Sequence, residues 1–180
     1  YDSDSIRYYL ISNGPERKDT NFTEENFKNV HNGEILNKFG NLVNRTLNFK
    51  GLEEIPIGNM DNEIENLIKK TYIEVEDCIE KLEFKLAVEK IMYLVENSNK
   101  YYDTNKPWIC RNEDISKFNN VIYTCSVVIA NLANLFEPIM PESCGKIREY
   151  LKIKEKKWEY ILIDENLKLS SIEPLFKRIQ

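Results

Sequence analysis

The chain has 180 residues, of which 42% are hydrophobic and 31% charged, and its net charge is −5. This length fits one domain, or one domain with a small appendage, and the hydrophobic fraction is enough for a core. No stretch approaches the roughly 18 consecutive apolar residues of a membrane span, so we expect no membrane partner. The spacing of the cysteines is typical of free thiols in a cytoplasmic protein, which is the localisation that we expect. The chain begins at Tyr1 without an initiator methionine, and we expect it to be a piece of a longer polypeptide.

The first part of the chain predicts short helices. One is expected over 4–11, with Ser3 or Asp4 as its N-cap. A second is expected to begin after Thr23, whose side chain can cap it. Gly33 is expected to break or kink the path before the next helix, because glycine is a poor helix former.

The middle of the chain predicts longer helices. Isoleucine, leucine and valine recur at helical spacing over 61–81, 84–103, 114–136 and 141–151. The sequence from Asn105 to Trp108 is expected to end the second of these, since its proline cannot continue a helix. Residues 51–80 are strongly acidic and are expected to face away from any polyanion.

After residue 152 the pattern changes. Residues 158–163 alternate partly and predict a short extended segment that pairs with 167–169. Leu175 and Phe176 are expected to dock on the helices. The fold class is therefore all-α, an antiparallel bundle of about five substantial helices with a short extended C-terminal segment. We divide the chain into a linker at 1–20, a helical bundle at 21–152 and a C-terminal segment at 153–180 that packs back on the bundle.

The helix predicted over 34–49 has a narrow polar face rich in asparagine. At 100° per residue, several polar side chains fall within about 60° of Asn41, namely Glu34, Asn37, Lys38, Asn44, Arg45 and Asn48. Asparagine is a poor helix former, so this composition is unusual, although the chain has 21 asparagines in all. Asn41 and Arg45 are four residues apart and therefore neighbours. Their amide and guanidinium suit the Watson–Crick edges of unstacked RNA bases, and a solvated helix face is the alternative.

A second informative stretch is the Pro107-Trp108 pair, which follows a long helix. A tryptophan placed by a rigid proline can stack on a splayed base, an interaction worth about 1–3 kcal/mol. The alternative is a tryptophan that caps the core at the helix end.

The sequence contains no pattern that points to catalysis. His31 is the single histidine, has no implied partner and is expected to be structural or on the surface. Glycine-rich phosphate loops are absent. The four cysteines form no Cys-x-x-Cys pair, which argues against a zinc site and a disulfide scaffold. We expect no metal and free, buried thiols at Cys78, Cys110, Cys125 and Cys144.

Seven short motifs occur in one order along the chain. They are Asp4-Ser5-Ile6-Arg7-Tyr8-Tyr9-Leu10, Asp19-x-x-Phe22-Thr23, Gly40-Asn41-Leu42-Val43-Asn44-Arg45, Asn99-x-Tyr101, Pro107-Trp108, Pro138-x-Met140-Pro141 and Leu175-Phe176-x-Arg178-Ile179. Together they resemble the C-terminal part of methionyl-tRNA synthetases, and the resemblance covers essentially the whole chain. No single motif is decisive, but the set in this order is specific.

The resemblance implies a helical bundle that binds the anticodon of methionine tRNA. It implies that Asn41 and Arg45 hydrogen-bond to the first base of the CAU anticodon and that Trp108, with Pro107 before it, stacks on that base. Weaker candidates for the surrounding rim are Asn37, Lys38, Asn44, Asn48 and Asn99. The segment 4–11 resembles the end of the stem-contact region that joins the bundle to the catalytic domain.

The family's catalytic signatures, His-Ile-Gly-His and Lys-Met-Ser-Lys-Ser, are absent from the sequence. Its zinc-bearing insert and its appended oligonucleotide-binding module are absent as well. We therefore expect no catalytic residue and no cofactor in this chain, since ATP belongs to the family's catalytic domain. The chain is expected to be monomeric, to bind tRNA weakly on its own, and to be unable to activate methionine.

Three alternatives remain. The nearest is the anticodon-binding bundle of a class I synthetase for leucine, isoleucine, valine or cysteine. Another is a helical protein-interaction scaffold, for which an exposed Leu/Ile/Phe patch, with Trp108 buried far from Arg45, would be the expected mark. The third is a small stand-alone enzyme, which lacks a catalytic constellation here.

Overall fold

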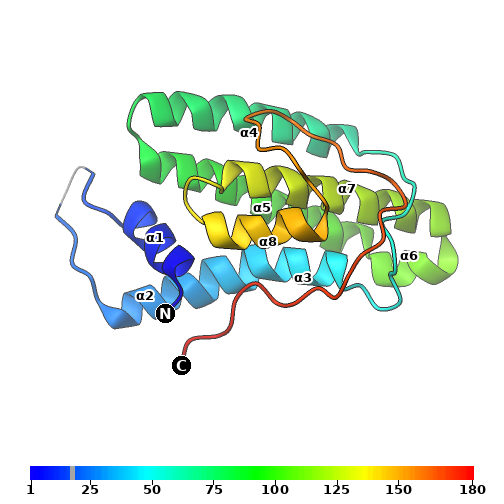
Figure 1. Cartoon of the computed structure of the whole chain (residues 1–180), viewed down its shortest axis with the longest axis horizontal. Helices are drawn as coiled ribbons and strands as arrows, with labels where there is room; N and C mark the ends of the chain where they lie inside the picture. Colours follow the sequence, from blue (N-terminus) through cyan, green and yellow to red (C-terminus); the bar gives the residue numbers. More distant parts are fainter. Residues whose placement is uncertain (17–18) are drawn as a thin grey trace.

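The apolar periodicity of the sequence becomes a bundle of helices around one core. The computed structural model describes residues 1–16 and 19–180, and Figure 1 shows the arrangement. The helices are α1 (Ser3–Ser12), α2 (Glu24–Val30), η1 (His31–Gly40), α3 (Asn41–Leu47), α4 (Asn62–Glu80), α5 (Phe84–Asn105), α6 (Pro107–Glu113), α7 (Ile115–Leu135) and α8 (Pro141–Tyr150). The described residues form no strand, only an isolated bridge between Glu54 and Lys168. The predicted all-α fold is confirmed.

Helix α7 lies at the centre of the bundle. Nearly all of its residues from Phe118 to Leu135 are buried, and it packs against α3, α4, α5, α6 and α8. A helix that is apolar on all sides is typical of the middle of a core. Figure 1 shows α4 and α3 at opposite edges of the bundle, so the acidic α4 lies far from α3.

The predicted break at Gly33 is wrong. Helices α2, η1 and α3 follow one another without interruption, and η1 is a π-helix of ten residues. The wider π-turns are visible at its end, where the Asn41 amide donates to the Leu36 carbonyl five residues back. A glycine in a helix costs only about 1 kcal/mol, and the packing of the buried side chains of η1 outweighs that cost.

Of the two predicted N-caps near the start of the chain, one is wrong and one is confirmed. The N-cap of α1 is Asp2, which accepts from the Ser5 amide at 2.8 Å, and not Ser3 or Asp4. Asp4 is buried and instead accepts from the Ser143 amide at the start of α8, at 2.6 Å. Thr23 caps α2 as predicted.

The short helix α6 was not predicted. Pro107 was interpreted only as the end of the preceding helix, which does end at Asn105, but it is also the first residue of α6. Proline suits a first helical position, because its missing N–H is not needed there. Lys106 joins the two helices with a left-handed φ of 46°.

The predicted pairing of residues 158–163 with 167–169 is wrong. Leu167 and Leu169 exchange backbone hydrogen bonds of 2.9 Å with Ile55 and Glu53 instead. The side-chain amide of buried Asn131 holds the backbone of Ile161: its nitrogen donates to the Ile161 carbonyl at 2.8 Å, and its oxygen accepts from the Ile161 N–H at 2.9 Å. Alternation of apolar and polar residues favours an extended segment but does not specify its partner. The partner is the backbone or side chain that the fold brings near.

The expectations for the C-terminal hydrophobic residues, the cysteines and the histidine are confirmed. Phe176 is buried and Leu175 packs on the core. The four cysteines are free and buried. His31 is buried and structural, with Nδ1 2.7 Å from the Ser5 hydroxyl and Nε2 2.9 Å from the Lys177 carbonyl. Among the described residues no helix could cross a membrane and no group of His, Cys, Asp and Glu could hold a metal.

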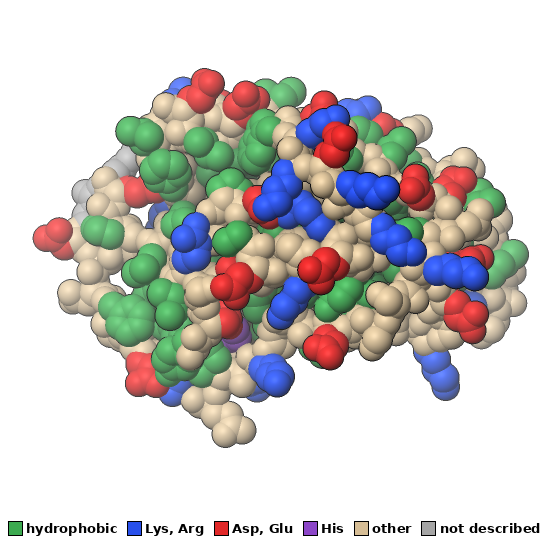
Figure 2. Space-filling model, viewed as in Figure 1, with side chains coloured by type: hydrophobic (Ala, Val, Ile, Leu, Met, Phe, Trp, Pro, Cys, Tyr) green, Lys and Arg blue, Asp and Glu red, His purple; other side chains and the backbone are tan. Residues whose placement is uncertain are grey.

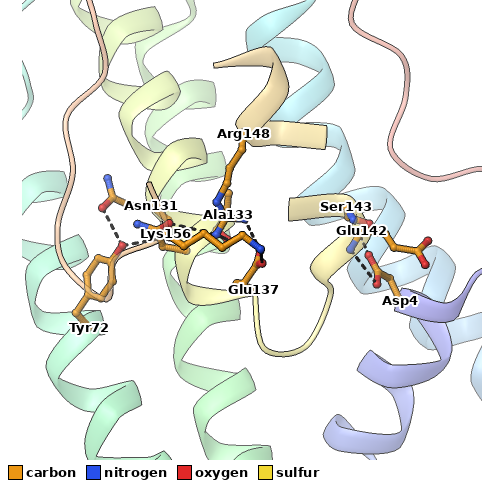
Figure 3. A network of polar contacts seen from close by, with 10 residues as sticks. Asp4, Tyr72, Asn131, Ala133, Glu137, Glu142, Ser143, Arg148 and Lys156 are labelled. Carbon is orange, nitrogen blue, oxygen red and sulfur yellow. Dashed lines mark hydrogen bonds and ion pairs between the residues drawn. The ribbon is translucent and has the colours of Figure 1, made fainter. Parts of the chain in front are cut away.

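A buried polar network joins the end of α7 to α8 (Figure 3). The guanidinium of Arg148 pairs with Glu137 and donates to the Ala133 carbonyl at 3.2 Å. Lys156, from the C-terminal segment, pairs with the same carboxylate. Burial raises the pKa of Glu137, but the hydrogen bonds from Lys156 and Arg148 outweigh burial and lower it below its ordinary value.

This lowered pKa predicts an acid-dependent loss of stability. Glu137 binds protons more readily in the unfolded chain, so its contribution is complete above its unfolded pKa of about 4.3. The contribution is lost as the pH falls through the folded pKa. We expect urea unfolding midpoints from pH 7 to pH 3 to fall more steeply for the native chain than for Glu137→Gln. Parallel curves for the two proteins would contradict this prediction.

Candidate nucleic-acid interface

The candidate interface begins on the outer face of α3. Leu42, Val43 and Leu47 are buried in the core, which leaves Asn41 exposed and Arg45 partly exposed. The amphipathic pattern of the sequence therefore orients the helix as predicted. Asn41 and Arg45 line the same groove between this helix and α5.

The guanidinium of Arg45 is held from three sides. Nη1 donates to Asp103 Oδ1 at 2.7 Å, and Nη2 donates to the Asn99 carbonyl at 3.0 Å. The guanidinium carbon lies 4.1 Å from the centre of the Tyr102 ring, a distance typical of a cation–π contact. The side chain is 20% exposed, so its position is fixed while part of it stays accessible to solvent.

One donor of Arg45 has no partner. Its Nε is buried, and no described residue accepts from it. A buried unsatisfied donor costs about 1–3 kcal/mol and is therefore uncommon in folded proteins.

Trp108 also contacts Tyr102. The two rings have centroids 6.1 Å apart and planes inclined at 38°, within the range of interacting aromatic pairs. Trp108 is 49% exposed, whereas Pro107 is buried at the first position of α6. Pro107 thus places Trp108 and leaves its ring accessible. This arrangement is the opposite of the buried, distant tryptophan expected for a protein-interaction scaffold.

The groove beside Arg45 has a volume of about 610 Å³. Side chains of η1 and α3 form one wall and side chains of α5 form the other, and polar or charged groups line it, among them Asn37, Lys38, Asn41, Asn99 and Lys100. Three of the five predicted rim residues, Asn37, Lys38 and Asn99, therefore lie beside Asn41 and Arg45. The π-helical turn of η1 does not remove Asn37 and Lys38 from this face.

The rim residues also have partners within the protein. Lys38 pairs with Glu96 at 2.6 Å, and the Asn99 amide donates to the Lys38 carbonyl at 3.2 Å. Asn44 and Asn48 are bonded to each other at 2.8 Å, outside this groove. The last two thus lie on the side of α3 that faces the C-terminal segment.

Sequence reasoning missed the two residues that fix Arg45. Tyr102 contacts both Arg45 and Trp108, and its hydroxyl donates to the Arg45 carbonyl at 2.9 Å. Burial raises the pKa of Tyr102 to about 12, so the hydroxyl stays protonated. Asp103 supplies the counter-charge. The Tyr101-Tyr102-Asp103 run stood in the stretch before Trp108, but its pairing with Arg45 depends on how α3 and α5 pack.

The end of the molecule formed by α1, α2 and the α4–α5 turn has a more hydrophobic surface than the groove beside Arg45. Figure 2 shows hydrophobic side chains gathered where α1, α2 and the α4–α5 turn lie. Exposed large apolar side chains there include Tyr1, Leu10, Phe22 and Leu82. Elsewhere on this view Lys, Arg, Asp and Glu are interspersed. An apolar patch and a polar Asn/Arg/Trp cluster therefore occupy separate parts of the surface.

Comparison with known proteins gives consistent matches. Residues 61–173 match the family described as "Anticodon-binding domain of tRNA ligase", and residues 1–47 match "tRNA synthetases class I (M)". A methionine–tRNA ligase of Alkaliphilus oremlandii is 40% identical over 182 residues, which cover 99% of this chain and 34% of that protein. One from Bacillus anthracis is 42% identical over 186 residues, covering 99% and 33%.

The fold is also found among solved structures. The free form of Mycobacterium tuberculosis methionyl-tRNA synthetase superposes with a TM-score of 0.88 and 25% identity, over 98% of this chain and 39% of that one. The chain thus spans about a third of the length of the relatives that it matches.

Proposed function

We propose, since this chain belongs to the anticodon-binding domain family of tRNA ligases, that its Asn41/Arg45 face reads the CAU anticodon of methionine tRNA. In this proposal residues 21–152 bind the anticodon loop, residues 1–20 connect to the stem-contact region, and residues 153–180 brace the bundle. Charging of the tRNA with methionine, at the expense of ATP, belongs to a catalytic domain such as those of the longer relatives. The chain itself acts as a monomer in the cytoplasm and holds no cofactor.

The chemistry of the groove suits a cytosine. The Watson–Crick edge of cytosine presents two acceptors, N3 and O2, and one donor, the N4 amine. Arg45 can only donate, so its accessible edge matches N3 and O2. The Asn41 amide oxygen can accept from N4. Guanine at the same position would present N1–H and an N2 amine to the guanidinium, which leaves donors facing donors.

The observation that carries the proposal is the contact of Tyr102 with both Arg45 and Trp108. The Arg45 guanidinium lies over the Tyr102 ring, and the Trp108 ring centre lies 6.1 Å from that of Tyr102, so one side chain helps to position both a hydrogen-bonding cation and an exposed aromatic ring. A base that is splayed from the loop needs both kinds of contact, since hydrogen bonds give specificity and stacking gives affinity.

The test compares anticodon stem-loops that carry CAU or GAU, at low salt because backbone contacts weaken as salt rises. We expect the native chain to prefer CAU. Trp108→Ala is expected to weaken CAU binding by roughly 5- to 150-fold, which corresponds to the 1–3 kcal/mol of a base–aromatic stack. Titration of a labelled hairpin, followed by fluorescence anisotropy, measures the CAU preference of the native chain and the weaker binding of Trp108→Ala.

The matched control is Trp158→Ala. Trp158 is also partly exposed but packs on Tyr72, at the other side of the bundle. Its removal is expected to leave CAU binding within about twofold of the native value. Equal affinity of the native chain for both hairpins, or equal loss in the two tryptophan variants, would overturn the proposal. Preference for a leucine, isoleucine, valine or cysteine anticodon would support the alternative synthetase.

A further inference from the structure

His31 is the single histidine of the chain, and its buried imidazole joins three parts of the molecule. The residue lies where α2 ends and η1 begins. Nδ1 lies 2.7 Å from the Ser5 hydroxyl of α1, and Nε2 lies 2.9 Å from the Lys177 carbonyl of the C-terminal segment. The Ser5 hydroxyl also lies 2.8 Å from Oδ2 of Asp2. These three contacts run from Asp2 through Ser5 and His31 to Lys177, and we call them the His31 network.

The two ends of the His31 network fix where its hydrogens lie. A carbonyl can only accept, so Nε2 of His31 must carry a hydrogen. The Asp2 carboxylate can only accept, so the hydrogen between Asp2 and Ser5 belongs to the Ser5 hydroxyl. Ser5 has one hydroxyl hydrogen and therefore cannot also donate to His31. The contact between Ser5 and Nδ1 is a hydrogen bond only when Nδ1 carries a hydrogen as well.

We propose that His31 is an imidazolium in the folded chain and that its charge fastens the C-terminal segment to α1. With hydrogens on both ring nitrogens, all three contacts of the network are hydrogen bonds. With a neutral ring, Ser5 must turn its hydrogen to Nδ1, and its oxygen then faces the Asp2 carboxylate without a hydrogen between them. The positive ring and the carboxylate of Asp2 balance each other through Ser5, which offsets the cost of a buried charge.

Other charged side chains on the neighbouring turns of α1, α2, η1 and the C-terminal segment have partners of their own. These pairs are Asp4 with the Ser143 amide, Arg7 with the carbonyls of Pro138 and Ile139, Lys28 with Glu24, Glu34 with the Tyr8 hydroxyl, and Arg178 with Asn37. The Lys177 side chain is exposed, and this residue contacts His31 through its backbone. Asp2 is therefore the carboxylate that hydrogen bonds connect to His31.

The segment that His31 holds also supports the rim of the groove beside Arg45. Arg178 donates to Asn37 Oδ1 at 3.2 Å, and Asn37 lines that groove. The backbone of Ile179 is bound by both polar atoms of the Asn32 amide, at 2.9 and 3.0 Å. Loss of the proton from His31 weakens the contact with the neighbouring Lys177, because a charged donor makes a stronger hydrogen bond than a neutral one. The charge of one imidazole thus controls how firmly residues 177–179 are held.

The test is Asp2→Asn, which reverses the hydrogen bonds of the network without removing the helix cap. The amide oxygen of asparagine still accepts from the Ser5 amide, whereas its nitrogen donates to the Ser5 hydroxyl. Ser5 must then donate to Nδ1, so His31 becomes neutral with its hydrogen on Nε2. Because the chain has one histidine, its ring nitrogens give a single pair of signals in a ¹H–¹⁵N correlation spectrum. The control is Asp164→Asn, which removes the same charge at an exposed position outside the network.

At pH 7.5, where a free histidine is mostly neutral, we expect the native chain and Asp164→Asn to show both ring nitrogens protonated. Asp2→Asn is expected to show a protonated Nε2 and a bare Nδ1. Amide exchange at Ile179 is expected to be about fivefold faster in Asp2→Asn than in the native chain, the difference between a charged and a neutral hydrogen bond, and to be unchanged in Asp164→Asn.

A neutral ring in the native chain, or an imidazolium that persists in Asp2→Asn, would overturn the inference. Equal exchange at Ile179 in Asp2→Asn and Asp164→Asn would overturn the role of the charge in fastening the C-terminal segment. None of these measurements involves RNA, so they test this inference apart from the proposed function.

Discussion

Replacing Arg45 with alanine is expected to lower the affinity for a CAU hairpin by roughly 10- to 150-fold and to abolish the preference over GAU. The range follows from the 1.5–3 kcal/mol of hydrogen bonds made by a charged group. Arg45 is the part of the groove that matches the cytosine acceptors, and its guanidinium is already fixed by Asp103 and Tyr102. Little conformational entropy is therefore lost when a base binds.

Two further variants separate recognition from charge. Arg45→Lys keeps the charge but not the planar fork and is expected to recover binding without recovering the CAU preference. Lys117→Ala removes an exposed cation from α7 and is expected to weaken both hairpins by the same factor, if it has any effect. If Arg45→Ala keeps the full preference for CAU over GAU, Arg45 is not part of the binding site. Thermal unfolding of each variant checks that the fold persists.

Replacing Arg148 with alanine is expected to reduce the free energy of unfolding by about 3–5 kcal/mol. Arg148 is only 6% exposed, and its guanidinium holds Glu137, the Ala133 carbonyl and the Asn134 side chain (Figure 3). Its loss leaves the Glu137 carboxylate and the Ala133 carbonyl without this partner. Lys156 still pairs with Glu137, which favours the lower end of the range. Urea unfolding followed by circular dichroism measures the change.

The control on the same helix is Lys146→Ala, an exposed position that is expected to change stability by less than about 0.5 kcal/mol. The double change Arg148→Met with Glu137→Leu is expected to recover much of the loss, because apolar residues can replace a buried ion pair. A loss below about 1 kcal/mol in Arg148→Ala would show that the pair contributes little net stability.

Local rules determined most of the helices. Apolar spacing placed the long helices to within a few residues, and Thr23 and Asp61 cap as their side-chain chemistry requires. Local reasoning also placed Asn41 and Arg45 together, because residues four apart on a helix are neighbours whatever the rest of the fold does. Sequence reasoning also singled out the Pro107-Trp108 pair, but it left a core-capping tryptophan open, and the exposure of Trp108 was decided by the structure.

Local rules failed where a nearby partner outweighed propensity. The expected break at Gly33 became part of a continuous π-helix, since buried residues on either side pack into the core. The C-terminal segment paired with Glu53 and Ile55 rather than with itself. Both outcomes depend on contacts between residues far apart in the sequence, which periodicity does not encode.

The sequence by itself determined the helical class, the amphipathic face of α3 and the identity of Asn41, Arg45 and Trp108 as candidates. Only the tertiary structure decided how they act together. It brought Tyr102 into contact with both Arg45 and Trp108 and set Asp103 against the guanidinium. It also set the C-terminal segment beside Asn37 and Asn44. The physical reason is that helix propensity and spacing act over a few residues, whereas a binding groove forms between elements whose relative positions are fixed by packing of the common core.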